Sequence, residues 1–202
     1  MSLVIVDTSC ANLSSVKFAF ERLGVKPLIS ADPERIRSAE RVVLPGVGTA
    51  KAAMRNLQAL DLVNTLRELE QPVLGICLGM QLMTQWSAEG NVDCLGLIPA
   101  RTVALENSGQ PLPHMGWNTV SEVGTNPLLK DLSAPAYCYF VHSYAVAIDE
   151  NTIASTDYGQ QFASMIRAGN YFGAQFHPER SGAVGAQILK NFMELSDADT
   201  RT

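Results

Sequence analysis

Apolar runs alternate with segments of helical periodicity over residues 1–90. The runs Leu3–Val6, Arg41–Leu44 and Val73–Ile76 are almost wholly apolar, which is typical of strands buried on both faces. Between them, Leu13–Leu23 and Ala50–Leu69 repeat apolar residues at the spacing of an α-helix. The pattern therefore predicts an α/β fold with an open, mostly parallel sheet flanked by helices.

The pattern changes over residues 95–175, where the apolar runs are shorter and turn residues separate them. These runs predict additional, antiparallel strands at Ala100–Leu105, Trp117–Val120, Tyr137–Val141, Thr152–Ser155, Phe162–Ile166 and Tyr171–Phe176. The segment Gly182–Leu195 is amphipathic and predicts a closing helix, and the polar tail 196–202 is expected to fray. No repeat or linker interrupts the chain, so residues 1–202 are expected to form a single domain.

Composition and charge exclude several classes of protein. The chain is 47% hydrophobic and only 17% charged, which leaves apolar surface for a partner. Its net charge of −5 gives no positive field for nucleic acid or an anionic membrane. No basic segment precedes the first apolar run, and no apolar stretch reaches the roughly 18 residues that span a bilayer. We therefore expect a cytoplasmic protein.

The cysteines and histidines indicate neither a metal nor a disulfide. Cys10, Cys77, Cys94 and Cys138 are far apart and form no Cys-x-x-Cys pair, so each is expected to be a free thiol. The histidines do not have the spacing of a ligand set either. No metal and no cofactor are expected.

Cys77 is the first candidate for chemistry. It lies in Gly75-Ile-Cys-Leu-Gly79, the nucleophile-elbow pattern with sulfur in place of oxygen. The glycines make room for a sharp strand-to-helix turn, and the helix N-terminus beyond it favours a thiolate. The N–H of Leu78 can then meet an oxyanion. A small core residue at a strand end is the alternative, and the glycine frame favours the nucleophile.

A base is predicted at His177. Glu179 follows it at i+2, and an extended segment would place both side chains on the same side, so that the carboxylate orients the ring. Alone, this pattern fits a structural histidine equally well, but together with Cys77 it suggests a triad. His114 and His142 have no nearby acid and are interpreted as packing or binding-site residues.

The turn Pro45-Gly-Val-Gly48 follows a predicted strand and is the third candidate. Its glycines let peptide N–H groups face a ligand, so the N–H of Gly46 or Val47 could join that of Leu78 in an oxyanion hole. An ordinary connection without a ligand is the alternative. The turn lacks the rest of a dinucleotide or Walker pattern, so nucleotide binding is the poorer interpretation.

Gly75–Gln81 and His177–Glu179 together resemble the signature of the class I (triad) glutamine amidotransferases, whose glutaminase domain spans nearly this whole chain. Three further blocks, Pro45–Gly48, His114–Asn118 and Tyr139–Tyr144, resemble those of the glutaminase subunits of imidazole glycerol phosphate synthases, in histidine biosynthesis. The resemblance implies a class I glutamine amidotransferase-like fold.

The same resemblance implies the roles of the triad. Cys77 would attack the side-chain amide of glutamine, His177 would pass the proton to the leaving ammonia, and Glu179 would orient His177. Hydrolysis of the thioester would then release glutamate.

It also implies a pocket for the rest of glutamine. Gln81 and Glu89 would hold the α-amino end, with help from the backbone around Ser143 and Tyr144, and Gly48 would line the same pocket. For Glu89, a solvated acid after a helix is an equally good interpretation.

Finally, the resemblance implies a heterodimer with a separate (β/α)8-barrel synthase subunit that receives the ammonia. The block His114–Asn118 would lie near that interface, with Trp117 as an anchor, although a core tryptophan is as common. Three alternatives remain: the same chemistry for an anthranilate or aminodeoxychorismate synthase, a catalytically silent binding subunit, and a stand-alone thiol hydrolase.

Overall fold

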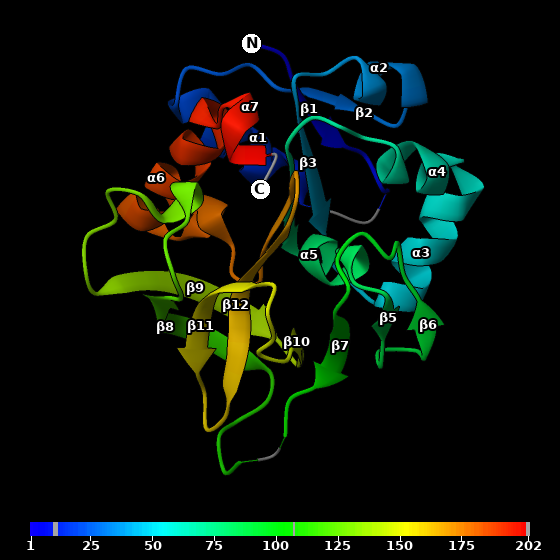
Figure 1. The fold of residues 1–202 in the computed structure, drawn as a ribbon. Coiled ribbons are helices and arrows are strands. Elements are labelled where there is room, and N and C mark those ends of the chain that lie inside the picture. Colours follow the sequence, from blue (N-terminus) through cyan, green and yellow to red (C-terminus); the bar gives the residue numbers. More distant parts are fainter. Residues whose placement is uncertain (10–11, 107, 201–202) are drawn as a thin grey trace.

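The computed structural model describes residues 1–9, 12–106 and 108–200 (Figure 1). Strands and helices alternate in the N-terminal part: β1 (Leu3–Val6), α1 (Leu13–Arg22), β2 (Leu28–Ser30), α2 (Pro33–Arg37), β3 (Arg41–Gly46), α3 (Ala50–Ala59), α4 (Leu62–Arg67), β4 (Val73–Cys77) and α5 (Leu78–Met83). The rest is mainly strand until the closing helices: β5 (Trp86–Ser87), β6 (Val92–Asp93), β7 (Arg101–Ala104), β8 (His114–Glu122), η1 (Pro127–Leu129), β9 (Ala136–His142), β10 (Tyr144–Val146), β11 (Thr152–Asp157), β12 (Gln161–Ala168), β13 (Tyr171–Ala174), η2 (Pro178–Arg180), α6 (Gly182–Glu194) and α7 (Asp197–Thr200).

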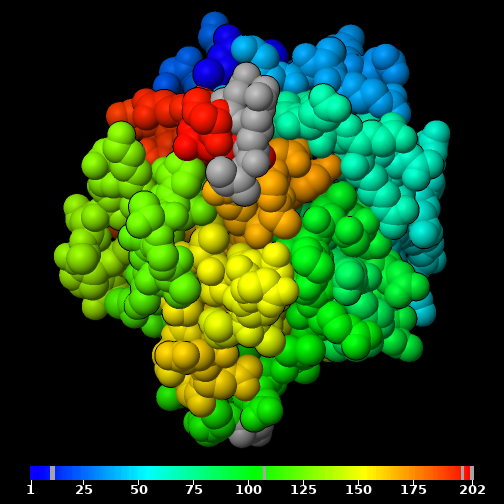
Figure 2. All heavy atoms as spheres, viewed as in Figure 1, coloured from blue at the N-terminus to red at the C-terminus, as the bar shows by residue number. Residues whose placement is uncertain are grey.

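The strands form a mixed sheet in the order β2-β1-β3-β4-β13-β12-β10-β7-β5-β6, and β11, β8 and β9 extend from β12. From β2 to β13 neighbouring strands run parallel. Strands β12, β10 and β7 are each antiparallel to the strand before them in this order, and β5 then runs parallel to β7. The predicted fold class, a mostly parallel sheet with additional antiparallel strands, is confirmed. In Figure 2, blue, cyan and red segments form the upper part of the face shown, and mainly green and yellow segments form its lower part.

The parallel half has helices on both faces, and the side chains of its strands alternate between two apolar clusters. In β1, Leu3 and Ile5 pack in the cluster that includes Phe20 of α1 and residues of α6. Val4 and Val6 pack in the opposite cluster, with residues of α3 and α4. Strands covered on both faces need apolar residues at every position, which explains the unbroken apolar runs of the sequence.

Among the described helices, none is both long and apolar enough to cross a membrane.

Several elements differ from the expectations. The helical run 50–69 is two helices, because Asp61 adopts a left-handed φ of 56° between α3 and α4. Strand β13 pairs antiparallel with β12 but parallel with β4. Residues 197–200 of the supposedly frayed tail form α7, where the Arg167 guanidinium donates a hydrogen bond to the Asp199 carbonyl. Residues 201–202 lie outside the described part of the chain.

Candidate active site

The elbow at Cys77 is sharply bent and tightly packed. Cys77 ends β4 with φ 54° and ψ −111°, a backbone conformation that L-residues rarely adopt. A Cβ on Gly75 would lie 2.7 Å from the Met80 nitrogen, and one on Gly79 would lie 1.8 Å from the Leu44 carbonyl oxygen. Both glycines are therefore needed for the close approach of backbone to backbone, as the sequence predicts.

The Cys77 thiol is buried, with 8% of the residue exposed, and it contacts only a few polar groups. Its Sγ lies 3.8 Å from the Val141 carbonyl oxygen, and Nε2 of Gln175 donates to it at 3.7 Å. Leu78 is the first residue of α5, so its N–H has no acceptor within the helix. This N–H is therefore available to an oxyanion formed next to Sγ.

His177 and Glu179 form a buried ion pair, in which Nδ1 of the ring lies 2.8 Å from Oε1 of the carboxylate. The expected contact exists, but the reason given for it was wrong. The segment after His177 is the 3₁₀ turn η2, not an extended chain, and this turn brings the carboxylate back to the ring. Nε2 of His177 is buried and has no hydrogen-bond partner among the described residues, so it is free to exchange a proton with a reacting group.

The surroundings of His177 favour the charged ring. Burial lowers the pKa of His177, but its interactions with the nearby Cys77 side chain and its ion pair with Glu179 outweigh burial and raise the pKa to about 10. An imidazolium beside a thiol stabilises the thiolate that remains when the proton moves to the ring.

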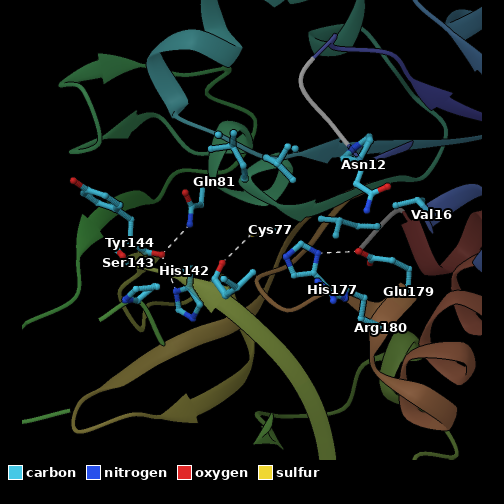
Figure 3. Close-up of a pocket in the computed structure, with 18 of the residues that line it drawn as sticks. Asn12, Val16, Cys77, Gln81, His142, Ser143, Tyr144, His177, Glu179 and Arg180 are labelled. Atoms are coloured by element: carbon cyan, nitrogen blue, oxygen red, sulfur yellow. Dashed lines mark hydrogen bonds and ion pairs between the residues drawn. The ribbon is translucent and has the colours of Figure 1, made fainter. Parts of the chain in front are cut away.

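A cavity of about 400 Å³ opens beside these residues (Figure 3). Every site residue predicted from the sequence lines it: Gly46, Val47, Gly48, Cys77, Leu78, Gln81, Glu89, Ser143, Tyr144, His177 and Glu179. Cys77 ends β4 and His177 lies just beyond the end of β13, its parallel neighbour, whereas Ser143 and Tyr144 come from the antiparallel half. Ligands of open α/β sheets bind at such strand ends.

The glycine turn beside the elbow begins later than expected. Pro45 and Gly46 still belong to β3, and Gly46 lies opposite Cys77 in the ladder with β4. A Cβ on Gly46 would lie 2.8 Å from the Gly79 nitrogen, so this position also requires glycine. The turn proper starts at Val47, and Gly48 has a φ of 94° that favours glycine. The N–H groups of this turn therefore lie beside the elbow.

Gln81 and Glu89 each keep one oxygen available as a hydrogen-bond acceptor. Nε2 of Gln81 donates to the Tyr144 carbonyl oxygen at 2.8 Å and to Oε1 of Gln175 at 2.9 Å, which uses both of its hydrogens and leaves Oε1. Oε2 of Glu89 accepts from the N–H of Ala50, the first residue of α3, at 2.8 Å. Glu89 is therefore more than a solvated acid, and its other oxygen can face a substrate ammonium group.

Sequence reasoning missed several residues of this cavity. The cavity is also lined by Asn12, Val16, Val141 and Arg180. Gln175 hydrogen-bonds to two lining residues, Cys77 and Gln81. A polar residue within the otherwise apolar run Tyr171–Phe176 was the available sequence signal for Gln175, which the structure buries fully. Asn12 and Arg180 come from loop and turn positions, for which the sequence pattern gave no signal.

The other thiols have no comparable setting. Burial raises the pKa of Cys94 and Cys138 to about 12, which fits the structural role expected of both. Cys10 lies outside the described residues. Within the described ranges, no group of histidine, cysteine and acidic side chains is arranged to hold a metal.

The sequence profile of the family described as "Glutamine amidotransferase class-I" matches residues 5–195. The chain belongs to the class I glutamine amidotransferase family. The family resemblance seen in the sequence is therefore confirmed.

Within this family, the chain is most usefully compared with relatives that match it over nearly their whole length. A protein of Idiomarina loihiensis named "Imidazole glycerol phosphate synthase subunit HisH" is 66% identical, over 97% of this chain and 99% of its own length. A protein of Haemophilus influenzae with the same name is 54% identical, over 96% and 98%. The glutaminase domain of Trypanosoma brucei CTPS superposes with a TM-score of 0.65 at 15% identity, covering 100% of this chain and 98% of that domain, which shows the shared fold.

Proposed function

We propose that this amidotransferase is the glutaminase subunit of an imidazole glycerol phosphate synthase and supplies ammonia in histidine biosynthesis. The observation that carries the glutaminase chemistry is the strained Cys77 in one cavity with the His177–Glu179 pair. Relatives named HisH at 50–66% identity favour this synthase over an anthranilate or aminodeoxychorismate enzyme. The presence of Cys77 together with the His177–Glu179 pair disfavours a catalytically silent subunit.

In the proposed reaction, the raised pKa of His177 keeps the proton taken from Cys77 on Nε2 of the ring, and Sγ attacks the side-chain carbonyl carbon of glutamine. The N–H of Leu78 and one N–H of the Gly46–Gly48 turn stabilise the oxyanion. The C–N bond then breaks as His177 returns the proton to the leaving nitrogen, which departs as ammonia. Water, activated by His177, hydrolyses the thioester to glutamate and restores the thiol.

The α-amino group of glutamine would be held by acceptors. Oε1 of Gln81 and the free oxygen of Glu89 are suited to an ammonium, and the backbone of Ser143 and Tyr144 lines the same cavity. This arrangement recognises the amino-acid end of the substrate and leaves the amide end facing Cys77. A thiol hydrolase for unrelated acyl compounds would not require acceptors for an α-amino group.

Strands β8 and β9 carry a group of exposed large side chains. Met115 and Trp117 of β8 and Tyr137 of β9 are 65%, 57% and 50% exposed, which is unusual for large apolar side chains on adjacent strands. Trp117 is therefore an exposed residue and not a core one. We propose that this surface contributes to the heterodimer with a (β/α)8-barrel synthase subunit. The cytoplasmic location and the single domain expected from the sequence stay predictions.

The test is glutamine hydrolysis by the chain alone and with its synthase subunit and that subunit's substrate. We expect glutaminase activity to rise strongly when the synthase subunit has bound its own substrate. In the complex, Cys77→Ala should lower kcat by more than about a thousandfold. Cys94→Ala is the matched control, because it removes a buried thiol outside the cavity. Equal turnover by Cys77→Ala and wild type would contradict the triad.

A further inference from the structure

Two histidines outside the triad meet in the core beside the cavity. His114 opens β8 and His142 ends β9, and the two lie directly opposite each other in the antiparallel ladder. Both are buried, and Nδ1 of His114 lies 2.9 Å from Nε2 of His142. His142 itself lines the cavity, between Val141, whose carbonyl oxygen is the one near Sγ of Cys77, and Ser143.

The hydrogen bonds fix which nitrogen of each ring carries the proton. Nδ1 of His142 lies 2.9 Å from the Tyr144 carbonyl oxygen, which can only accept, so Nδ1 carries the hydrogen. In a neutral ring Nε2 is then an acceptor, so His114 must donate from its Nδ1. Nε2 of His114 in turn accepts from Nδ2 of Asn118, 3.3 Å away. The bonds therefore run in one direction, from Asn118 through both rings to Tyr144.

Both rings are held in the neutral form that this order requires. Burial lowers the pKa of His114 to about 4 and that of His142 to about 3. Aromatic rings surround the pair, with Tyr158 stacked on His114 and Phe162 edge-on to His142. A proton on both nitrogens of either ring would set two donors against each other and break the chain of bonds.

The chain of bonds ends on the wall of the glutamine cavity (Figure 3). The Tyr144 carbonyl oxygen accepts from both His142 and Gln81, and Gln81 also donates to Gln175. Without the bond from His142, this carbonyl oxygen, next to the break at Ser143 between β9 and β10, loses one of its two side-chain donors. The free acceptor of Gln81 would lose its fixed direction as a result.

We propose that His114 and His142 are positioning residues of the glutaminase: their ordered pair of hydrogen bonds holds Tyr144, and through it Gln81, in the orientation that binds the α-amino end of glutamine. This role rests on the proposed function. It explains why two histidines are buried as a pair without any acid, although a phenyl ring would pack equally well among Phe140, Phe162 and Tyr158.

The test compares variants of the chain in its complex with the synthase subunit. His142→Phe keeps an aromatic ring but removes both hydrogen bonds, and we expect the KM for glutamine to rise about tenfold while kcat stays within about threefold. His142→Asn keeps an N–H near the position of Nδ1, so its KM should stay within about threefold of wild type. Thr156→Val is the matched control, because it removes a buried hydrogen bond to the Thr119 carbonyl oxygen of β8 outside this chain of bonds.

A purely structural role would make His142→Phe and Thr156→Val alike, with a lower unfolding temperature and an unchanged KM per folded molecule, and this result overturns the proposal. Should His142→Phe fail to fold, nitrogen-15 NMR of the wild-type imidazoles decides, since protonation of Nε2 instead of Nδ1 in His142 at pH 7 overturns it equally. A wild-type complex without glutaminase activity overturns the proposed function and this role together, whereas an active one with unchanged KM in His142→Phe overturns this role alone.

Discussion

Gly79→Ala adds a single methyl group at the tightest point of the elbow. The new Cβ would lie 1.8 Å from the Leu44 carbonyl oxygen and 2.8 Å from the Leu44 carbonyl carbon, where real Cβ contacts are almost never under 3.0 Å. The backbones of β3 and α5 must therefore separate by more than about 1 Å. Because both partners are backbone atoms of buried elements, no rotamer change relieves the clash.

Two effects of opposite sign decide the stability of this variant. Alanine is favoured over glycine inside a helix by about 1 kcal/mol. Overpacking in a close-packed core costs about 1–3 kcal/mol, and a clash with backbone belongs at the upper end. We expect a net loss of about 2 kcal/mol in the free energy of unfolding, so the variant should still fold.

The effect on turnover should be larger than the effect on stability. Leu44 is followed by Pro45 and Gly46, which line the cavity, so a shift of β3 moves the predicted oxyanion donors away from Cys77. A displacement of about 1 Å at a reacting centre costs about a hundredfold in rate. We therefore expect kcat/KM for glutamine to fall about a hundredfold.

The assay is urea unfolding together with glutamine hydrolysis by the complex, expressed per folded molecule. Gly124→Ala is the matched control, because Gly124 has a φ of 73° and open space around its Cβ position, in a loop away from the cavity. It should lose about 1 kcal/mol of stability from backbone strain and keep its kcat/KM. Wild-type kcat/KM in folded Gly79→Ala would refute the view that the spacing between β3 and the elbow controls the reaction.

Three further predictions concern the ion pair, the substrate acid and the partner surface. Glu179→Gln should lose about 3–5 kcal/mol of stability at pH 6. Interactions with Cys77 and Glu179 raise the pKa of His177 to about 10, from about 6.5 in the unfolded chain, so the stability contributed by the charged ring is complete below about pH 6.5 and is lost as the pH rises through 10. Urea unfolding at pH 6, 8 and 10 checks this, and a constant difference would contradict it. Glu89→Gln should raise the KM for glutamine about tenfold with little change in kcat, as steady-state kinetics would show, and an unchanged KM would exclude a contact with the ammonium. Trp117→Ala should weaken binding of the synthase subunit about thirtyfold in calorimetry. Leu28 is 42% exposed in β2 at the far edge of the sheet, so Leu28→Ala should leave binding unchanged. Equal effects of the two substitutions would place the interface elsewhere.

Local patterns in the sequence were sufficient for the parallel half of the fold. Its strands are buried on both faces, so their apolar runs stand out, and the amphipathic spacing marks the helices that cover them. Strands β5, β6 and β10 were missed because they have only two or three residues and form through pairing with distant strands. The break at Asp61 was missed because a single left-handed residue does not interrupt the apolar periodicity.

The residues that line the candidate site were predictable from the sequence, but the buried residues that hydrogen-bond to them were not. The glycines around Cys77 and the pattern His-Pro-Glu are local signals, and all eleven predicted residues line one cavity. Gln175 and the His114–His142 pair depend on which strands become neighbours, and a sequence pattern does not encode that. The contact of His177 with Glu179 was expected for the wrong reason, because Pro178 begins a 3₁₀ turn.

Strand register is what converts these separate patterns into a site. In the parallel pair of β4 and β13, Ile76 lies opposite Ala174, so Gln175 follows at the level of Cys77 and donates to its Sγ. Two residues later the chain reaches His177, just beyond the end of β13 and in the cavity that Cys77 lines. A slip of one residue would turn every side chain of β13 to the opposite face and remove the base from the nucleophile. The buried residues of β13, with Tyr171 and Phe172 in opposite apolar clusters, are therefore as necessary for the proposed triad as Cys77, His177 and Glu179 themselves.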